Sequence, residues 1–455
     1  MATGEILSKH ILRDRFAVAM SGMYCEEIPA YAALVEMVAK QNVKARSQHS
    51  HQNMFPEVEA GRAYHGAIRL GSIEDLRMMR RAFAVMGMQP VGYYDLSAAG
   101  LPVHSTAFRP ISSEAMEISP FRVFTSLLRL DMIEGEDLKQ RIKHLLSMRE
   151  VFTPRVVELI EIAETQVGLS DIQADEFVVE LLETFRWKKD ATVSLEEYEF
   201  FNQSNRLLAD IVSFHGPHIN HLTVGAEDID EAHKAIATCG VQPKSSIEGP
   251  PYRKCPILLR QTAFKAIEDL VLFPDGCGGH ERGSHMARFG EIEARGAALT
   301  PKGRALYDRL LAEAQARKDT APQALQRAFE DFPDDWDELR KRGLVYFQYR
   351  LTQRAMECSH LNRSACGVDQ LIETGLIDAL PVRYEDFLPV SAAGIFRSNL
   401  GEEDTVYAAG DSRKLEFEAC LGTSVLDMFD LYEAIETNSL SRCIQSLSAK
   451  VRQSA

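Results

Sequence analysis

Three short stretches of this sequence carry histidine and carboxylate side chains in an arrangement that could bind a metal ion. The stretch 214–223 reads FHGPHINHLT, the stretch 65–69 reads HGAIR, and the stretch 288–293 reads RFGEIE. Two imidazoles and one carboxylate on one side of an Fe(II) ion leave the other positions open for substrate and oxygen. The three stretches together therefore suggest a two-histidine, one-carboxylate iron site.

Strand geometry limits which of these side chains can meet, because alternate residues of a strand share a face. His218 and His221 lie three residues apart and face opposite sides, so only one of them belongs to such a site. Alternation along the strand does not show which of Glu291 and Glu293 would be the ligand, because the two residues share a face. Within each predicted strand, three residues share one face. They are His65, Ala67 and Arg69 in the first strand, Ile219, His221 and Thr223 in the second, and Phe289, Glu291 and Glu293 in the third.

Arg69 is the candidate for binding the far end of a substrate. It lies four strand residues beyond His65 on the same face, about 13 Å along the backbone at ~3.3 Å per residue. A guanidinium favours carboxylates geometrically, so this spacing suits a short dicarboxylic acid with its other end on the metal. The alternatives are an Arg69 that faces solvent or forms an ion pair, and a His65 that is an ordinary half-buried histidine.

The elements that would position these residues form two similar units. Apolar spacing predicts a strand at 64–70, a helix at 72–87 and a strand at 89–97. The same order returns as a strand at 219–224, a helix at 228–240 and a strand at 242–248, with further strands in 256–266 and 284–296. Residues 82–90 match 235–243 without a gap, which pairs His65 with His218. Two such units predict a pseudo-symmetric barrel with the site between them.

The rest of the chain is predicted to be mainly helical. Helical spacing indicates a pair of helices in 12–42, helices throughout 120–210 and further helices in 301–380. The segment 43–60 reads as a loop or a weak helix, and 381–400 is punctuated by proline and glycine. Glycines and charges between Cys277 and His285 predict a loop rather than a soft-metal site.

Composition excludes several classes of function. The 51 basic and 66 acidic residues give a formal net charge of −15, which argues against nucleic acid as a partner. We expect no membrane span and no signal peptide, because no apolar run is long enough. Eight cysteines without a CxxC pair favour a reducing cytoplasm. Neither a GxSxG elbow around Ser105 or Ser391 nor a glycine-rich phosphate loop is present.

Several longer motifs in the sequence resemble those of a known protein family. They include HGAIRLGS, SPFRVFTSLLRL, GPHINHLT, GSHMARFGEIEARGAALTPKGR and YEDFLPVSAAGIF, and they run in order between about residues 12 and 430. The chain resembles the 2-oxoadipate dioxygenase/decarboxylase family, the hydroxyglutarate synthases of bacterial lysine catabolism. That family is similar to the vicinal oxygen chelate superfamily, whose barrels are built from paired βαβββ modules around a metal.

The resemblance implies an α+β fold: a vicinal-oxygen-chelate-like β-barrel of two βαβββ-type modules, with a large inserted helical layer and a C-terminal helical extension. The implied regions are N-terminal helices at 1–60, a first barrel module at 61–119, a helical insertion at 120–210, a second barrel module at 211–300, and a helical C-terminal region at 301–455 with a site-closing segment at 384–400.

The resemblance also implies the roles of the candidate residues. It places the iron ligands at His65, His221 and Glu291, against the pairing of His65 with His218 in the ungapped repeat. Arg69 would hold the substrate and count among the catalytic residues, and the backbone near Val390 and Ser391 would close over it. His218 is then expected to be structural or to support the site, and His215 to lie in a loop.

The implied reaction converts 2-oxoadipate and O2 to 2-hydroxyglutarate and CO2 on Fe(II), by oxidative decarboxylation followed by intramolecular hydroxylation. The resemblance implies small-molecule substrates and no protein partner. Two alternatives remain open from the residues: a glyoxalase-like lyase or isomerase that uses another metal and consumes no oxygen, and a non-catalytic module that binds a small acid.

Overall fold

A curled sheet occupies the centre of the protein. The structure, a computed structural model, describes residues 5–48, 55, 61–316, 322–357, 367–388 and 411–453. Within this part of the chain the sheet has seven strands in the order β2-β3-β4-β1-β5-β9-β6. They are β1 (Ala63–Leu70), β2 (Gln89–Asp95), β3 (Val103–Arg109), β4 (Arg122–Leu128), β5 (His221–Gly225), β6 (Leu259–Ala263) and β9 (Phe289–Arg295).

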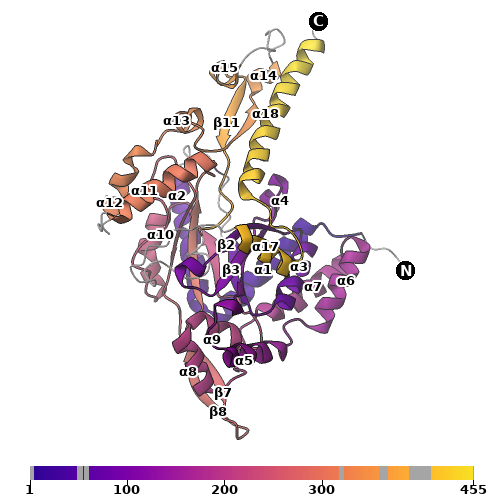
Figure 1. The fold of residues 1–455 in the computed structure, drawn as a ribbon. Helices are drawn as coiled ribbons and strands as arrows, with labels where there is room; N and C mark the ends of the chain where they lie inside the picture. The colour runs from indigo at the N-terminus through magenta and orange to yellow at the C-terminus, as the bar shows by residue number, and fades with distance from the viewer. Residues whose placement is uncertain are drawn as a thin grey trace.

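Helices cover the sheet, and further helices lie beside β11 away from it (Figure 1). They are α1 (Lys9–Glu27), α2 (Pro29–Gln48), α3 (Ile73–Val85), α4 (Ser113–Ile118), α5 (Glu136–Ser147), α6 (Pro154–Gln166), α7 (Asp171–Phe185), α8 (Leu195–Ser204), α9 (Arg206–Val212), α10 (Ile229–Ala235), α11 (Pro301–Ala316), α12 (Pro322–Ala328), α13 (Trp336–Lys341), α14 (Gln353–Glu357), α15 (Val368–Glu373), α17 (Asp411–Leu421) and α18 (Met428–Gln453). Among the described residues, no helix combines the length and apolar character that crossing a membrane requires.

The sheet consists of two modules with matching connections. In the first, β1 leads through α3 to β2, β3 and β4, and β4 returns to pair with β1 in parallel. In the second, β5 leads through α10 to β6 and β9, and β9 pairs with β5 in parallel. Antiparallel pairing of β1 with β5 joins the modules. The predicted duplication is therefore confirmed, and the junction of the modules lies at the centre of the sheet.

The second module lacks one predicted strand. Residues 242–248 contribute only isolated bridges, from Pro243 to Phe264 and from Glu248 to Gln261. The stretch contains a proline, which has no N–H to donate to a strand ladder, and two consecutive serines. The stretch lies at the edge of the sheet beside β6. This position corresponds to that of β2 beside β3 in the first module.

The helix starts settle how the two modules align. Helix α3 begins at Ile73 after the cap Ser72, and α10 begins at Ile229 after the cap Asp228, a separation of 156 residues. The same separation relates His65 to His221. The ungapped match with His218 fails because the second helix is shorter: α10 and the 3-10 turn that follows it end at Cys239. The ligand position that the family resemblance implies is therefore also the position that the duplication implies.

One stretch predicted to be helical is a strand. Residues 121–133 show helix-like apolar spacing, but 122–128 form β4, between β3 and β1. Every residue of β4 is buried. A strand buried on both faces reads as a continuous apolar run, and periodicity does not separate such a run from a buried helix. The helices of the inserted layer begin with α5.

Short strands also interrupt other regions. The segment predicted to be a loop around Cys277 is the tip of a hairpin, formed by β7 (Asp269–Pro274) and β8 (His280–His285). The helical stretch 301–380 contains a second hairpin, β10 (Phe347–Leu351) with β11 (Ile377–Pro381), which packs beside α18 (Figure 1). The helix pair at the N-terminus is confirmed, and α2 extends to Gln48, into the stretch expected to be loop or weak helix.

The two faces of the sheet bury different clusters. Outward side chains such as Ile68 and Leu222 pack against α1, α2, α3, α6 and α7 in the largest apolar core. Inward side chains such as Ala67 and Phe124 join a smaller core with α5, α8 and α9. Polar residues of β1, β5 and β9 share the inner face with this smaller core. A third cluster lies in the C-terminal region.

Candidate metal centre

The register of the sheet brings the candidate ligands together on its inner face. His65 on β1 stands opposite Thr223 on β5, and Thr223 stands opposite Glu291 on β9. His221 begins β5 one row away, between Ala67 and Phe289. Side chains directly across neighbouring strands lie about 5 Å apart at Cβ, so the three ligands converge. Each module supplies at least one of them.

The three side chains form a compact, fully buried cluster. One ligand atom from each of His65, His221 and Glu291 can be chosen so that all lie within 4.8 Å of one another. Oε1 of Glu291 lies 3.0 Å from Nε2 of His65 and 3.9 Å from Nε2 of His221. The two imidazole rings are nearly perpendicular, with centroids 5.5 Å apart. All three residues have zero exposure.

Glu293 orients His65. Its Oε2 lies 2.7 Å from Nδ1 of His65, and Arg295 binds the same carboxylate through two hydrogen bonds of 2.6 and 2.9 Å. Burial would raise the pKa of Glu293, but the charges of Arg295 and His65 outweigh burial and lower it, so the carboxylate is ionised. Nδ1 therefore donates to Glu293, and Nε2 faces the cluster. Such a carboxylate behind a histidine is typical of metal sites.

The donor set fits a cation. A neutral His65 that donates from Nδ1 presents a lone pair at Nε2, only 3.0 Å from an oxygen of Glu291. Two facing lone pairs favour a proton or a metal ion between them, because the Thr223 hydroxyl, 3.0 Å from Nε2 and 2.8 Å from Oε1, has one proton and can donate to only one of the two atoms. Burial would lower the pKa of His65, but Glu293 and Glu291 raise it, as expected for an imidazole that holds a positive charge in this position.

His221 supports the same conclusion. Both of its buried ring nitrogens lack a hydrogen-bond partner among the described residues, as does Oε2 of Glu291. Buried polar atoms are normally paired, and an unpaired one costs free energy. Burial lowers the pKa of His221 to about 4, so the imidazole is neutral and its lone pair is available to a metal. A metal ion could bind one ring nitrogen of His221 together with the carboxylate of Glu291.

Two neutral side chains fix the carboxylate of Glu291. Thr223 Oγ1 donates to Oε1 at 2.8 Å, and Gln261 Nε2 donates to the same oxygen at 2.8 Å. Burial would raise the pKa of Glu291, but the nearby His221 and His65 lower it. Glu291 is therefore an ionised candidate ligand, held at Oε1 by two hydrogen bonds, and Oε2 has no hydrogen-bond partner among the described residues.

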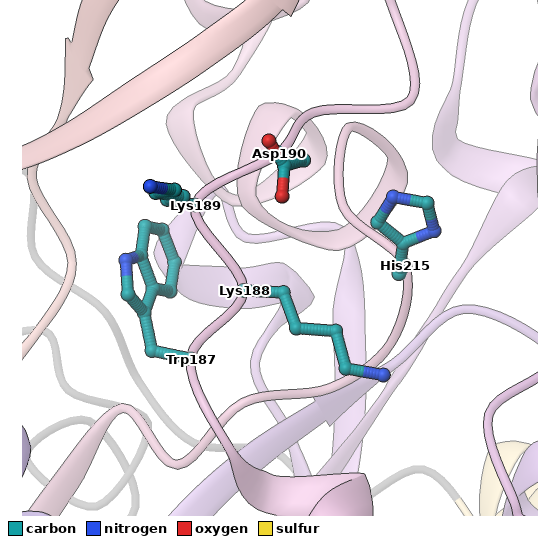
Figure 2. A pocket seen from close by; sticks show the side chains of 5 residues that line it. All are labelled: Trp187, Lys188, Lys189, Asp190 and His215. Atoms are coloured by element: carbon teal, nitrogen blue, oxygen red, sulfur yellow. The ribbon is translucent and has the colours of Figure 1, made fainter.

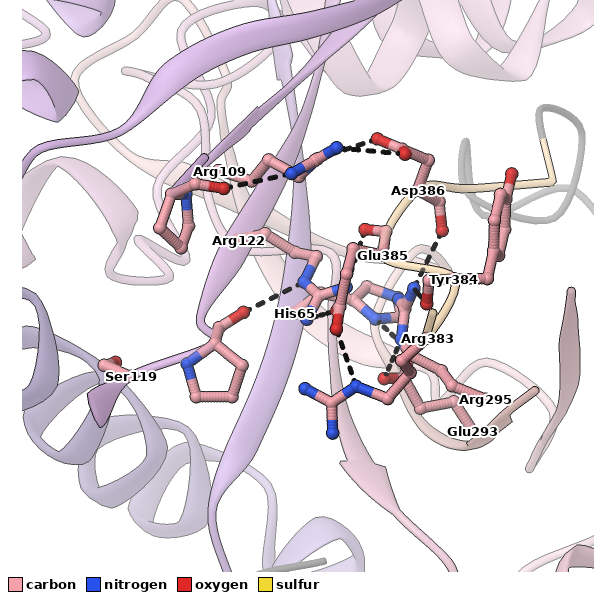
Figure 3. Close-up of polar contacts among 12 residues, drawn as sticks. His65, Arg109, Ser119, Arg122, Glu293, Arg295, Arg383, Tyr384, Glu385 and Asp386 are labelled. Atoms are coloured by element: carbon pink, nitrogen blue, oxygen red, sulfur yellow. Dashed lines mark hydrogen bonds and ion pairs between the residues drawn. The ribbon is translucent and has the colours of Figure 1, made fainter. Parts of the chain in front are cut away.

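Residues 383–388 cross one end of the inner face and are held there by arginines (Figure 3). Arg109 binds both oxygens of Asp386, at 2.8 and 3.1 Å. Arg122 approaches Glu385 to 2.7 Å, and Arg295 donates to the backbone of residues 384 and 386. These three arginines come from β3, β4 and β9. We call residues 383–388 the strap.

The strap also contacts a candidate ligand. The ring of Phe387 packs edge-on against His65 with centroids 4.9 Å apart, and it contacts Phe124 at 5.3 Å. Phe387 has zero exposure. Its ring is therefore an apolar wall that limits the access of water to His65. The predicted site-closing segment begins here, and Val390 and Ser391 lie outside the described residues.

Arg69 lies on the same strand face as His65, as predicted, and it forms an ion pair. Its Nη1 donates to Oδ2 of Asp210 on α9 at 2.5 Å. Asp210 also contacts His218 and His285, so His218 belongs to a second buried cluster and not to the metal centre. His215 is exposed in the loop before β5, where it was expected.

A surface hollow of about 560 Å³ lies apart from the metal centre (Figure 2). Trp187, Lys188, Lys189 and Asp190 line it from one segment, and His215 faces them from another. It contains none of the candidate ligands. The buried polar cluster, and not this hollow, has the chemistry of a site.

Sequence reasoning missed several supporting residues. Thr223 and Glu293 shared the predicted rows with His221 and Glu291, so alternation already placed them on the right face. Gln261 and Phe387 had no local signal, because their partners lie 30 and more than 300 residues away in the chain. Such contacts are created by the fold alone.

The paired βα modules and the buried two-histidine, one-carboxylate cluster define a vicinal-oxygen-chelate-like protein with a candidate metal centre. Comparison with known sequences is more specific. The chain belongs to the 2-oxoadipate dioxygenase/decarboxylase family, whose sequence profile matches residues 16–399. The family resemblance seen in the motifs is thereby confirmed.

Individual relatives match over nearly their whole length. The 2-oxoadipate dioxygenase/decarboxylase of Escherichia coli K12 is 49% identical over 439 residues, which cover 95% of this chain and 97% of the relative. That of Pseudomonas putida is 45% identical over 462 residues, with 98% and 99% coverage. The crystal structure of the Pseudomonas putida hydroxyglutarate synthase in complex with 2-oxoadipate superposes with a TM-score of 0.89 at 43% identity, covering 98% and 100% of the two chains.

Proposed function

We propose that this protein is an Fe(II)-dependent dioxygenase and decarboxylase that converts 2-oxoadipate and O2 to 2-hydroxyglutarate and CO2. The observation that carries the proposal is the buried cluster of His65, His221 and Glu291, whose ligand atoms lie within 4.8 Å of one another and which includes unpaired polar atoms on His221 and Glu291. The names of the relatives support the substrate, since proteins similar along the whole chain act on 2-oxoadipate. The reaction balances, because both oxygen atoms of O2 end in the two products.

His65, His221 and Glu291 would hold the metal, and Glu293 would keep the Nε2 lone pair of His65 directed at it. A bound Fe(II) would supply a centre that binds the 2-oxo acid end of the substrate and activates O2. Arg69 would pair with the far carboxylate and so select a substrate of the right length. Phe387 and Phe124 would exclude water from the reacting end.

Three further assignments belong to the same proposal. The backbone near Val390 and Ser391 would close over the substrate, continuing from the strap. The protein would act in lysine degradation, where 2-oxoadipate is consumed, and it would work in a reducing cytoplasm. The cysteines of the described segments support the last point, because all six of them are free thiols.

The test replaces His65, His221 and Glu291 singly by alanine and measures bound iron and O2 uptake with 2-oxoadipate. Each change should remove iron binding and O2 uptake while the protein stays folded. Full activity in any one variant would remove that residue from the ligand set. Turnover of a 2-oxo acid without O2 uptake in the unmodified protein would instead indicate a lyase or isomerase.

A further inference from the structure

Asp210 is the centre of a buried polar cluster that the proposed reaction does not use directly. Its side chain is 4% exposed. Oδ2 accepts from Arg69 at 2.5 Å and from Asn220 at 3.3 Å, and Oδ1 lies 2.8 Å from Nε2 of His285 and 3.2 Å from Nε2 of His218. Both carboxylate oxygens are therefore engaged from two sides.

A second layer holds the histidines of this cluster. Tyr198 OH lies 2.8 Å from Nδ1 of His285, so both ring nitrogens of His285 have partners. The Trp187 ring lies parallel to His285 at 6.0 Å between centroids and edge-on to His218 at 4.7 Å. The cluster cannot easily rearrange, because each polar atom that moved would lose a buried partner.

The members of this cluster come from the inserted helices and from the hairpin of the second module. Tyr198 lies on α8, Asp210 on α9 and His285 at the end of β8. Helices α8 and α9 stand beside the β7–β8 hairpin in Figure 1. The inserted helices therefore reach the inner face of the sheet at Arg69, the one residue of β1 that the proposed function assigns to the substrate.

A hydrogen-bonded anchor describes the Asp210 cluster better than a second metal site does. Asp210, His218 and His285 have ligand atoms close enough to hold an ion. However, His285 is engaged at both nitrogens and Asp210 at both oxygens, with ordinary hydrogen-bond distances. His221 in the metal centre differs, because neither of its nitrogens has a partner among the described residues.

We propose that Asp210, held by His285 and Tyr198, positions the Arg69 guanidinium and thereby sets the chain length of the dicarboxylate that the enzyme accepts. This inference rests on the proposed role of Arg69 in the proposed function. An arginine side chain is long and has many rotamers, so its charge alone defines no distance from the metal. Asp210 accepts a hydrogen bond from Nη1 of Arg69 at 2.5 Å and so constrains where the guanidinium can lie.

The charges agree with this role. Burial would raise the pKa of Asp210, but Arg69 and His218 lower it well below the usual range, so Asp210 stays ionised. The pair of Asp210 and Arg69 is then neutral overall. A substrate carboxylate would be recognised by the direction of the N–H groups more than by an uncompensated charge, and recognition by direction is sensitive to distance.

The experiment measures kcat/KM for O2 uptake with 2-oxo diacids of five, six and seven carbons and with 2-oxohexanoate, which lacks the far carboxylate. Asp210→Asn removes one carboxylate acceptor, either toward Arg69 or toward His285. We expect the preference for the six-carbon diacid to fall about 10- to 100-fold, since a misplacement on the order of 1 Å costs about that much. The value for 2-oxohexanoate should change far less.

Two variants complete the comparison. Tyr198→Phe removes the hydroxyl behind His285 and should lower the same preference by about fivefold, the effect of one neutral hydrogen bond. Asp230→Asn is the matched control, because Asp230 forms a two-bonded pair with Arg260 at 2.6 and 3.0 Å on α10 and β6. The control should leave the chain-length preference unchanged.

The outcomes separate the inference from the proposed function. If Arg69→Ala abolishes the preference and Asp210→Asn leaves it intact, the inference is wrong and the role of Arg69 stands. If Arg69→Ala also leaves it intact, that role fails and the inference fails with it. If Asp210→Asn does not fold, an unchanged preference in Tyr198→Phe refutes the inference. Two metal ions per folded chain would also overturn it, in favour of a second metal site.

Discussion

Glu293→Gln tests the link between the carboxylate behind His65 and metal affinity. Oε2 of Glu293 accepts from Nδ1 of His65 and from Arg295, and Oε1 accepts from Arg295 alone. A glutamine has one oxygen and one NH2 group, so either orientation points N–H at a donor. With NH2 toward His65, the imidazole would shift its proton to Nε2 and lose the lone pair that faces Glu291.

The size of the effect follows from how completely Glu293 is held. The residue is 1% exposed, and no water can take over the lost contact without entering a packed interior. Replacing such a carboxylate behind a ligand typically weakens metal binding about 10- to 100-fold. That range corresponds to about 1.4 to 2.7 kcal/mol. Activity at saturating metal should fall less than metal affinity does.

The assay is an anaerobic Fe(II) titration of the metal-free protein, with bound iron measured after gel filtration. Glu27→Gln is the control, because Glu27 is a half-buried carboxylate that also pairs with an arginine, with Oε2 2.6 Å from Nη1 of Arg288. It should leave iron affinity unchanged. Wild-type affinity in a folded Glu293→Gln protein would refute the orienting role, and equal weakening in both variants would point to a general loss of stability.

Two further predictions concern stability. Asp386→Asn leaves the buried Arg109 without its charged partner, so the free energy of unfolding measured in urea titrations should fall by about 3–5 kcal/mol. A loss below about 1 kcal/mol would show that this buried ion pair does not hold the strap in place. Burial lowers the pKa of His104 to about 4, so the unfolded chain binds more protons between about pH 4 and 6.5 and stability falls on acidification through that window. His104→Gln should therefore reduce the stability loss between pH 7 and 5 by about 2 kcal/mol, and an unchanged loss would show that His104 is not the titrating group.

The local sequence pattern was sufficient to predict the strands that carry His65 and Glu291. The alternation in 64–70 and 289–295 places His65 and Glu291 on single faces, and the observed strands β1 and β9 have these faces turned inward. The choice of Glu291 over Glu293 was beyond pattern, because both face the same way. Register separates the two carboxylates: Glu291 stands in the row of His65 and belongs to the candidate ligand set, and Glu293 stands one row further, where Arg295 can reach it.

The sequence pattern did not predict the structure where every residue of a strand is buried, or where a side chain pairs with a residue far away in the chain. The strand β4 was predicted to be a helix because all of its residues are buried and no alternation survives. The ion pair of Arg69 could not be assigned, since Asp210 follows it by 141 residues and lies on a helix of another layer. From the sequence, an Arg69 that faces solvent or forms an ion pair was as good an interpretation as an Arg69 that binds substrate, and the ion pair with Asp210 becomes visible only in the folded structure.

The geometry of β1 connects the metal centre with the Asp210 cluster. His65 and Arg69 lie on one strand, so their backbone separation is fixed by the rise of a rigid element, and only the arginine side chain adds freedom. The stretch 218–221 supplies both ends of the arrangement: His221 faces the metal centre, and His218 faces Asp210. His65 and Arg69 lie on one strand, and the stretch 218–221 lies beside both ends of it. This arrangement fixes the distance between the candidate metal ligand and the guanidinium. Under the proposed role of Arg69, that distance would set the chain length of a substrate with two carboxylates.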